Sequence, residues 1–293
     1  IYTLRNKRLT LHTMKLLRFR DKGKEKPAVL DKNNKIRDIS FHIKDLNPEY
    51  LNFETLSKLN NLDLTKLPEI TNSVRIGACI NKPGKFVAIG LNYSDHAKET
   101  GSKAPPEPIV FMKATSSICG PNDDIVKVKD SKKLDWEVEL AFVVGKEAKN
   151  ISDKEAPNHI LGYCIVNDIS EREWQIEKMG QWVKGKSGDT FGPTGPYLVT
   201  KDEISNINNL NLTLDVNEKR MQAGNTKNMI FNTNFLLSYL SKFMSLQPGD
   251  IVTTGTPAGV GMGMKPPVFL KPGDKIKLSI DNLGEQNSKV ITE

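Results

Sequence analysis

Short apolar runs bounded by turn-forming residues dominate the chain and predict β-strands. The buried-strand runs are flanked by Gly, Pro, Asn or Asp and cover residues 86–90, 138–144, 161–166, 212–216, 251–254 and 275–280. Helical spacing is clearest over 170–178 and 232–243. Because helices do not alternate with the strands, a doubly wound sheet is excluded. We expect a strand-rich α+β fold, with a mixed or antiparallel β-roll or barrel.

The first part of the chain has a pattern of its own. Short β-like runs at 15–19, 27–30 and 36–39 precede helical spacing between about 52 and 64, and the sequence Asn-Lys-Pro-Gly at 81–84 is a strong loop signal. We therefore expect a small N-terminal α+β domain over 14–80 and a larger domain over 81–293. Residues 1–13 are basic, contain no acidic residue and precede Met14. We expect an extension or start-site artefact there, since a transit peptide would be richer in serine.

Composition narrows the class of protein. The 293 residues carry a net charge of +7, but the basic residues alternate with acidic residues and Asn, so nucleic-acid binding is not expected. The mild positive charge favours a small anionic substrate. No apolar run approaches the roughly 20 residues of a membrane helix. The three cysteines, Cys79, Cys119 and Cys164, are too widely spaced for a CxxC site. We expect a soluble protein of the reducing cytoplasm.

Two glycine-rich stretches match nucleotide-binding patterns without the required context. Residues 180–187 satisfy G-x-x-x-x-G-K-S, but a phosphate loop follows a buried strand, whereas a helical stretch precedes this one. Residues 259–264 contain two of the glycines of a dinucleotide fingerprint without a βαβ unit, and we expect a flexible loop. Residues 185–189 fail the G-x-S-x-G pattern at their last position, so serine acyl-enzyme chemistry has no support.

Three carboxylates are candidates for a metal site. Glu137 and Glu139 share one face of a strand expected over 135–143, because side chains alternate with period two. Asp168 stands where an apolar strand ends, a common place for ligands. Three carboxylates without clustered His or Cys specify a hard cation such as Mg²⁺, Mn²⁺ or Ca²⁺. Taken singly, the glutamates also suit the solvated face of an edge strand, and Asp168 suits a helix cap.

His96 and Glu99 are candidates for proton transfer. They follow a buried strand and lie three residues apart, so on a helical turn they share a face. A carboxylate beside an imidazole orients the ring and raises its basicity, which suits a general base acting on water. By itself, His96 also fits a surface histidine in a loop.

Together these motifs resemble the fumarylacetoacetate hydrolase superfamily. They run in family order over 86–291: GLNY at 90–93 with His96 and Glu99, FMK at 111–113, DWEVEL at 135–140, ND at 167–168, KGKS at 184–187 and TGTPAGVG at 254–261. The finer resemblance is to the branch of 2,4-diketo-3-deoxy-L-fuconate or L-rhamnonate hydrolases, also named ureidoglycolate lyases. It is carried by residues 14–18, 99–101 with 105–108, 180–182 and 261–267.

The resemblance implies a metal-dependent β-roll catalytic domain that usually forms a homodimer. It implies a Mg²⁺ or Mn²⁺ ion held by Glu137, Glu139 and Asp168. His96 and Glu99 match a dyad on a lid that orders over the substrate. Lys186 matches a lysine facing the substrate's oxygens, and Thr256 a threonine contacting its carboxylate. Weaker candidates for the pocket wall are Lys113, Arg172 and Gln175. Gly188 departs from the branch, where Cys is common, and this bears on substrate preference.

The expected reaction is hydrolytic C–C cleavage of a 2,4-diketo acid to pyruvate and a second acid. A metal-chelated keto acid would stabilise the electrons released on cleavage, with Lys186 as an additional cation and water activated by His96 and Glu99. A 2,4-diketo-3-deoxy sugar acid is the preferred substrate. Ureidoglycolate cleavage, oxaloacetate decarboxylation and dienoate isomerisation or hydration are alternatives at the same site. A catalytically silent binding protein is disfavoured, because the acids and the dyad are intact.

Overall fold

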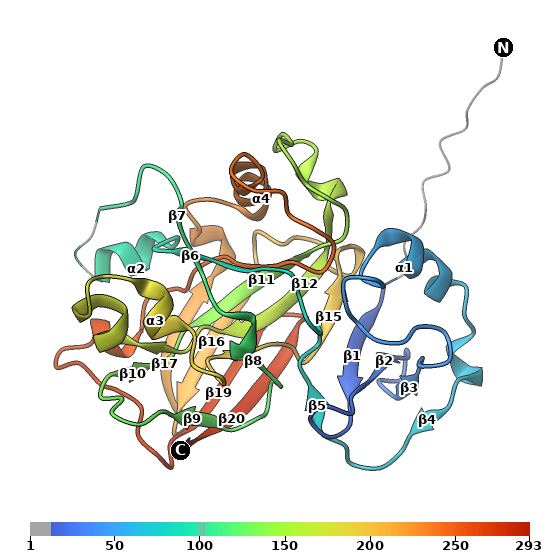
Figure 1. Cartoon of the computed structure of the whole chain (residues 1–293), viewed down its shortest axis with the longest axis horizontal. Helices are drawn as coiled ribbons and strands as arrows, with labels where there is room; N and C mark the ends of the chain where they lie inside the picture. Colours follow the sequence, from blue (N-terminus) through green and yellow to red (C-terminus); the bar gives the residue numbers. More distant parts are fainter. Residues whose placement is uncertain (1–12, 100, 102) are drawn as a thin grey trace.

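The computed structural model describes residues 13–99, 101 and 103–293, and strands dominate it. An eleven-stranded sheet runs through the molecule (Figure 1). Its order is β4 (Glu69–Ile70), β3 (Ile36–Asp38), β2 (Lys26–Leu30), β1 (Lys15–Phe19), β15 (Leu198–Thr200), β12 (Ile160–Asn167), β11 (Val138–Val144), β18 (Ile251–Thr253), β6 (Phe86–Gly90) and β7 (Ile109–Met112), with β5 (Ile76–Gly77) paired to β1.

A second sheet has five strands, and two short pairs complete the β-structure. The order of the second sheet is β17 (Lys219–Asn225), β16 (Asn211–Val216), β19 (Lys275–Ile280), β20 (Gly284–Thr292) and β9 (Ile125–Lys127). The short pairs are β10 (Leu134–Asp135) with β13 (Ser170–Glu171), and β8 (Ile118–Cys119) with β14 (Gly192–Pro193).

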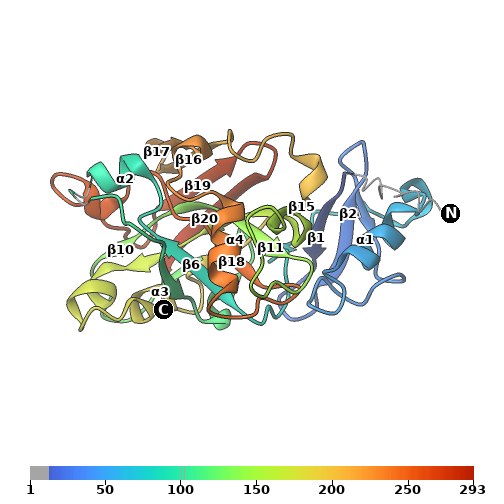
Figure 2. The ribbon, with the colours of Figure 1, turned by 90° about the horizontal axis from the view of Figure 1, so that it is seen from above.

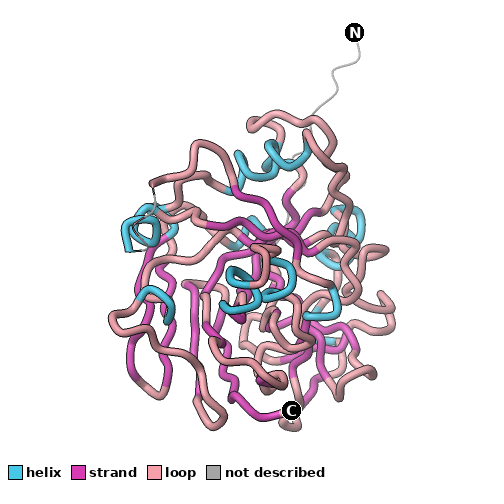
Figure 3. The backbone as a smooth tube through the Cα atoms, turned by 60° about the vertical axis from the view of Figure 1, so that its left-hand side comes forward, coloured by secondary structure: helices cyan, strands magenta, loops and turns pink. Residues whose placement is uncertain are grey.

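The helices are short, and Figure 3 shows how little of the backbone they occupy. They are α1 (Phe53–Asn60), α2 (Ser94–Glu99), α3 (Trp182–Lys186) and α4 (Thr233–Ser241), with a π-helical turn over Glu173–Glu177. Single 3₁₀ turns cover Leu64–Lys66, Thr115–Ser117, Ala156–Asn158, Lys201–Glu203, Thr226–Asn228 and Gly261–Gly263. No helix in the described part of the chain is long and apolar enough to cross a membrane. The strand-rich α+β prediction is confirmed.

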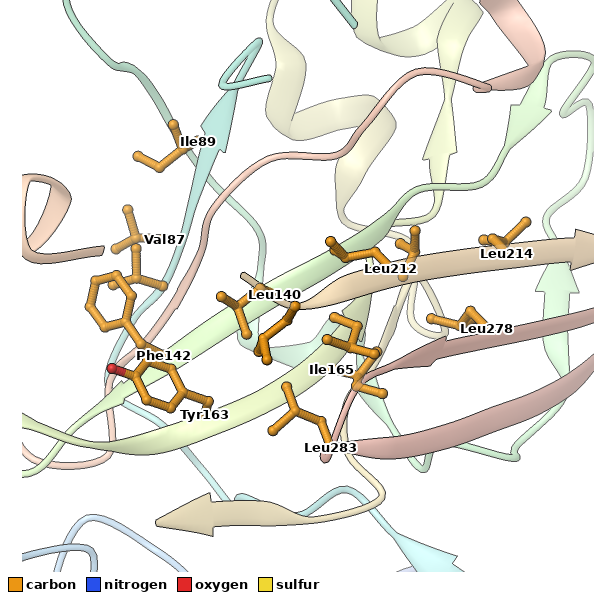
Figure 4. Packing of buried hydrophobic residues seen from close by; sticks show 14 of the residues in the cluster. Val87, Ile89, Leu140, Phe142, Tyr163, Ile165, Leu212, Leu214, Leu278 and Leu283 are labelled. Atoms are coloured by element: carbon orange, nitrogen blue, oxygen red, sulfur yellow. The ribbon is translucent and has the colours of Figure 1, made fainter. Parts of the chain in front are cut away.

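The main core lies between the two sheets because strand side chains alternate between faces. On β11 the even-numbered residues from Val138 to Val144 point into this core, while Ala141 and Val143 belong to a second core that also contains N-terminal residues. The side chain of Glu139 therefore points from β11 to the face opposite the main core. Figure 4 shows the main core, where β6, β11 and β12 pack against β16 and β19 through Val87, Ile89, Leu140, Phe142, Tyr163, Ile165, Leu212, Leu214 and Leu278.

The N-terminal strands extend the large sheet. β1 pairs antiparallel with β15, placing Leu16 opposite Leu198, and the backbone N–H of Met14 donates to Thr200 Oγ1 at 3.0 Å. The N-terminal strands and α1 lie at one end of the molecule, and α2 lies toward the other (Figure 1, Figure 2). The loop signal at 81–84 falls between β5 and β6.

Three local predictions are wrong. The strand expected over 135–143 is interrupted, since β10 ends at Asp135 and β11 begins at Val138. The helix expected over 170–178 starts as β13, because Ser170 and Glu171 pair with β10, and continues as the π-helical turn. The flexible loop expected over 259–264 contains an ordered 3₁₀ turn with a buried Gly261. In each case hydrogen bonds to a distant segment override the local pattern.

Candidate metal centre

Three buried carboxylates converge where β11 and β12 meet. Carboxylate oxygens of Glu137, Glu139 and Asp168 lie within 4.8 Å of one another, and the residues are 5%, 1% and 0% exposed. The sheet register explains this convergence. Val138 lies opposite Asn167 in the antiparallel pair, and the N–H of Asp168 donates to the carbonyl of Glu137 at 2.9 Å. The start of β11 and the end of β12 therefore bring the three acids together.

Lysine and arginine side chains surround two of these acids. Lys186 Nζ, at the end of α3, lies 2.8 Å from Glu137 Oε2 and 2.7 Å from Asp168 Oδ2. Arg172 Nη2 lies 2.6 Å from Glu137 Oε1. Burial alone would raise the pKa of Glu137, but Lys186 and Arg172 outweigh it and hold that pKa at about 2. Glu137 is therefore a stable anion.

Glu139 has different electrostatic surroundings. Its Oε2 accepts a hydrogen bond from the N–H of Gly255 at 2.9 Å. Burial raises the pKa of Glu139 well above its usual value, and the nearby carboxylates of Asp168 and Glu137 add to this effect. Burial and the two neighbouring acids thus make the ionised form of Glu139 unfavourable unless a further positive charge is bound nearby.

The donor set fits a divalent metal ion. Three carboxylate oxygens within reach of one ion are ligands that Mg²⁺ and Mn²⁺ prefer, and an ion there would relieve the repulsion around Glu139. The hydroxyl of Tyr93 is buried and has no hydrogen-bond partner among the described residues. Burial raises the pKa of Tyr93, and the charge of Glu139 raises it further.

His96 and Glu99 form a hydrogen-bonded pair on α2. His96 Nδ1 lies 3.1 Å from Glu99 Oε2, and His96 is 6% exposed. Glu99 Oε1 accepts a hydrogen bond from the N–H of Gly259 at 2.9 Å. Glu99 is thus held on both carboxylate oxygens, and it fixes the orientation of the imidazole.

One small cavity joins the acids and the pair on α2. Its volume is about 170 Å³. Its polar lining consists of His96, Glu137, Glu139, Arg172, Gln175, Lys186 and Thr256. Its apolar lining consists of Ile89, Leu91, Phe111, Ile176, Trp182 and Met262. The cavity can therefore hold a small anionic molecule in contact with both the acids and the histidine.

Lys113 is not among the residues that line this cavity, and its contact with substrate stays a prediction. Its side chain is 0% exposed, and Nζ lies 2.6 Å from Asp168 Oδ1. Nζ also donates to the backbone carbonyl of Lys186. Lys113 therefore lies behind the acids, where it neutralises Asp168 and fixes the end of α3.

Thr256 lines the cavity, but its hydroxyl group already makes two hydrogen bonds. Oγ1 donates to the carbonyl of Val138 at 2.9 Å and accepts from Gln222 Nε2 at 2.8 Å. Gln222 Oε1 accepts from the N–H of Val138 at 3.0 Å. Sequence reasoning missed Gln222, which fixes the backbone between the two glutamates. The signal that could have indicated Gln222 is that it is a polar side chain at a buried position of β17.

Sequence reasoning also missed the packing of Trp182 and the role of Asp135. Trp182 packs edge-on against Phe111 with ring centroids 5.2 Å apart, and Gly90 leaves the space that this indole occupies. Asp135 is fully buried and accepts hydrogen bonds from backbone N–H groups and from Arg172. Asp135 belongs to the motif DWEVEL, but the hydrogen-bond partners of Asp135 lie in distant segments, so the motif alone does not reveal its role.

Comparisons with known proteins agree with this fold. The profile of the family "Fumarylacetoacetate (FAA) hydrolase C-terminal" matches residues 85–291. A Burkholderia ambifaria protein that carries only a provisional hydrolase name is 55% identical over 274 residues, which cover 93% of this chain and 97% of that protein. The chain belongs to the fumarylacetoacetate hydrolase family.

Two solved structures extend the comparison. The fumarylacetoacetate hydrolase of Exiguobacterium antarcticum is 35% identical with a TM-score of 0.86, covering 96% of this chain and 100% of that one. The maleylpyruvate hydrolase of Sphingobium sp. SYK-6, solved with manganese(II) and pyruvate, is 28% identical with a TM-score of 0.79, covering 95% and 99%. Members of this family are enzymes that use divalent metal ions.

Proposed function

We propose that the protein is a divalent-metal-dependent hydrolase that cleaves a C–C bond of a 2,4-diketo acid, releasing pyruvate and a second acid. The observation that carries the proposal is that His96, Glu137 and Glu139 line one cavity, with Asp168 close to the two glutamates and Glu99 hydrogen-bonded to His96. The related maleylpyruvate hydrolase binds manganese(II) and pyruvate, which supports both the metal and the product. Glu137, Glu139 and Asp168 would hold Mg²⁺ or Mn²⁺, which would polarise the oxygens of the keto acid.

The side chains of this chain supply the proton transfers. With Nδ1 of His96 donating to Glu99, the other ring nitrogen is the basic one and can take a proton from an attacking water. Glu99 stabilises the resulting imidazolium by its negative charge. The ammonium group of Lys186 lies in the cavity wall and favours negative charge that develops on the substrate's oxygens.

The remaining polar groups orient the substrate. Arg172 Nη1 donates to Gln175 Oε1 at 2.9 Å, so these two side chains form one rigid part of the cavity wall. They would bind the carboxylate of the substrate, and Thr256 would join them only by exchanging its hydrogen bond to the carbonyl of Val138 for one to the substrate. The cavity of about 170 Å³ corresponds to the volume of about five or six water molecules, which suits a small acid. A 2,4-diketo-3-deoxy sugar acid and a simple acylpyruvate are the two substrates to compare.

The test is pyruvate release, measured by coupling to lactate dehydrogenase. Each substrate is offered with Mg²⁺, with Mn²⁺ and with EDTA. We expect metal-dependent pyruvate that is lost in His96→Gln and retained in His42→Gln, which changes a histidine that does not line the cavity. A folded, metal-loaded protein that releases no pyruvate from either substrate would contradict the proposal. The same protein would then be tested for ureidoglycolate cleavage, oxaloacetate decarboxylation and dienoate isomerisation or hydration.

Two further expectations stay predictions. The resemblance predicts a homodimer, which light scattering at several protein concentrations would measure. The cysteine pattern predicts a reducing location such as the cytoplasm.

A further inference from the structure

Asp135 is a buried carboxylate that connects two parts of the cavity wall. It stands at the end of β10 and is 0% exposed. Its Oδ1 accepts from the N–H of Gly261 at 2.7 Å, and its Oδ2 accepts from the N–H of Met262 at 3.0 Å. Arg172 Nε donates to the same Oδ2 at 2.8 Å. Charge-assisted bonds of this kind are about twice as strong as neutral ones.

On one side, Asp135 fixes the guanidinium group of Arg172. The three nitrogens of that group each have a different partner: Nε bonds to Asp135, Nη2 to Glu137 and Nη1 to Gln175. Because the guanidinium is planar and rigid, its orientation in the cavity wall depends on the position of Asp135.

On the other side, Asp135 fixes the loop over 259–263, which contacts the helix α2. The N–H of Gly259 donates to Glu99 Oε1 at 2.9 Å. A Cβ placed on Gly263 would lie 2.6 Å from Glu99 Cδ, so this loop packs directly on the carboxylate that orients His96. Asp135 thus holds the loop from inside the molecule, and Glu99 contacts it on the cavity side.

We propose that Asp135 is a positioning residue that sets, through Arg172 and the loop over 259–263, where the His96–Glu99 pair lies relative to the three acids. Within the described part of the chain, Asp135 is not among the residues that line the cavity, so it acts through the groups that do. This inference goes beyond the proposed function, since the positioning holds for any reaction at the site. Only its kinetic readout rests on that function.

The test compares Asp135→Asn with Asp123→Asn. Asp123 is a suitable control, because it also bonds a backbone N–H, that of Gly120, and a guanidinium, that of Arg75, and lies outside the cavity lining. Hydrogen–deuterium exchange is measured on peptides covering α2. In Asp135→Asn, an NH₂ group replaces one carboxylate oxygen and cannot accept the hydrogen bonds of the two N–H donors that it faces. We therefore expect exchange in α2 to rise about tenfold in Asp135→Asn and to stay unchanged in the control.

Gly263→Ala is the second variant and remains informative if Asp135→Asn does not fold. It displaces Glu99 from the loop side and should raise exchange in the same helix. Where the wild type turns over a diketo acid, kcat should fall about a hundredfold in Asp135→Asn, the usual cost of a displacement of about 1 Å, and remain unchanged in the control. Unchanged exchange in α2, or a uniform rise over the whole molecule, would overturn the proposal. A wild type without turnover would contradict only the proposed function, because exchange needs no substrate.

Discussion

Replacing Glu139 by Gln should separate metal binding from folding. The amide keeps the size of the side chain and an oxygen that can accept from the N–H of Gly255. It removes one of three acidic groups whose oxygens lie within 4.8 Å of one another. At an effective dielectric constant of about 20, a further unit charge at that distance would be repelled by about 3.5 kcal/mol, so burial and the neighbouring acids favour the neutral form of Glu139 without metal, which Gln resembles. We therefore expect the metal-free variant to be at least as stable as the metal-free wild type.

The metal-bound state should change in the opposite direction. A ligand at 100 times its Kd stabilises the folded protein by about 2.7 kcal/mol. Unfolding entropy of about 2.1 cal/mol/K per residue gives about 0.6 kcal/mol/K for 293 residues, so the wild type should gain about 4–5 °C in Tm. Glu139→Gln leaves two carboxylates, and its gain at the same metal concentration should be less than half of this.

Differential scanning fluorimetry with Mn²⁺, Mg²⁺ and EDTA measures both effects. Asp250→Asn is the matched control, because Asp250 is also fully buried but is paired with Lys85, outside the cavity lining. The control should lose stability and keep the full metal-induced gain in Tm. A gain in Glu139→Gln equal to that of the wild type would refute the assignment of the metal to these acids.

Three further predictions address packing, acid stability and the buried charges. Gly162→Ala should cost about 1–3 kcal/mol, because a Cβ there would lie 2.3 Å from the carbonyl oxygen of Val199. Burial alone would raise the pKa of Asp123, but hydrogen bonds from Arg75 outweigh it and lower that pKa below 3.8. The wild type should therefore lose stability as pH falls below about 3.8, and Asp123→Asn should lose less over that range. Lys186→Met should cost the metal-free protein about 1.5–3 kcal/mol, because it removes the ammonium group shared by Glu137 and Asp168, which keep Arg172 and Lys113 as partners, and Mn²⁺ should restore part of it.

Each of these predictions has a measurable contrary result. Chemical denaturation measures the free energy of unfolding of Gly162→Ala. A value equal to that of the wild type would mean that β12 and β15 can move apart without cost. Identical acid profiles of Tm for wild type and Asp123→Asn would contradict the lowered pKa. A metal-free Lys186→Met as stable as the wild type would show that the acids take up protons instead of relying on the lysine.

The strands were predictable because their apolar residues are local in the sequence: β6 and β11 are buried on both faces, and β19 alternates between buried and exposed positions. Residues 86–90, 138–144 and 275–280 match β6, β11 and β19 at both ends. The strand expected over 135–143 missed the break between Asp135 and Val138, which the local sequence does not encode. It arises because β10 pairs with β13 while β11 pairs with β12, and those pairings lie outside any local window.

The candidate site could be predicted only where its chemistry is carried by neighbouring residues. The spacing of Glu137 and Glu139, and of His96 and Glu99, is local, and the structure brings the two glutamates and His96 to one cavity, with Glu99 bonded to His96. The hydrogen bond of Lys113 to Asp168 spans 55 residues, and that of Gln222 to Val138 spans 84. No periodic pattern encodes such contacts, so the pairing of Lys113 with Asp168 could not be predicted from the sequence.

The pairing of β1 with β15 has a consequence for how the chain folds during synthesis. Met14 and Thr200, which bond to each other, are 186 residues apart. At about 5–20 residues per second, a ribosome needs roughly 10–40 s to add the intervening residues. Over that time the free edge of β1 has no partner from β15, and the apolar side chains of the early strands are open to solvent or to a chaperone. During synthesis, the pairing of this edge of β1 with β15 therefore has to wait for a single three-residue strand, Leu198–Thr200.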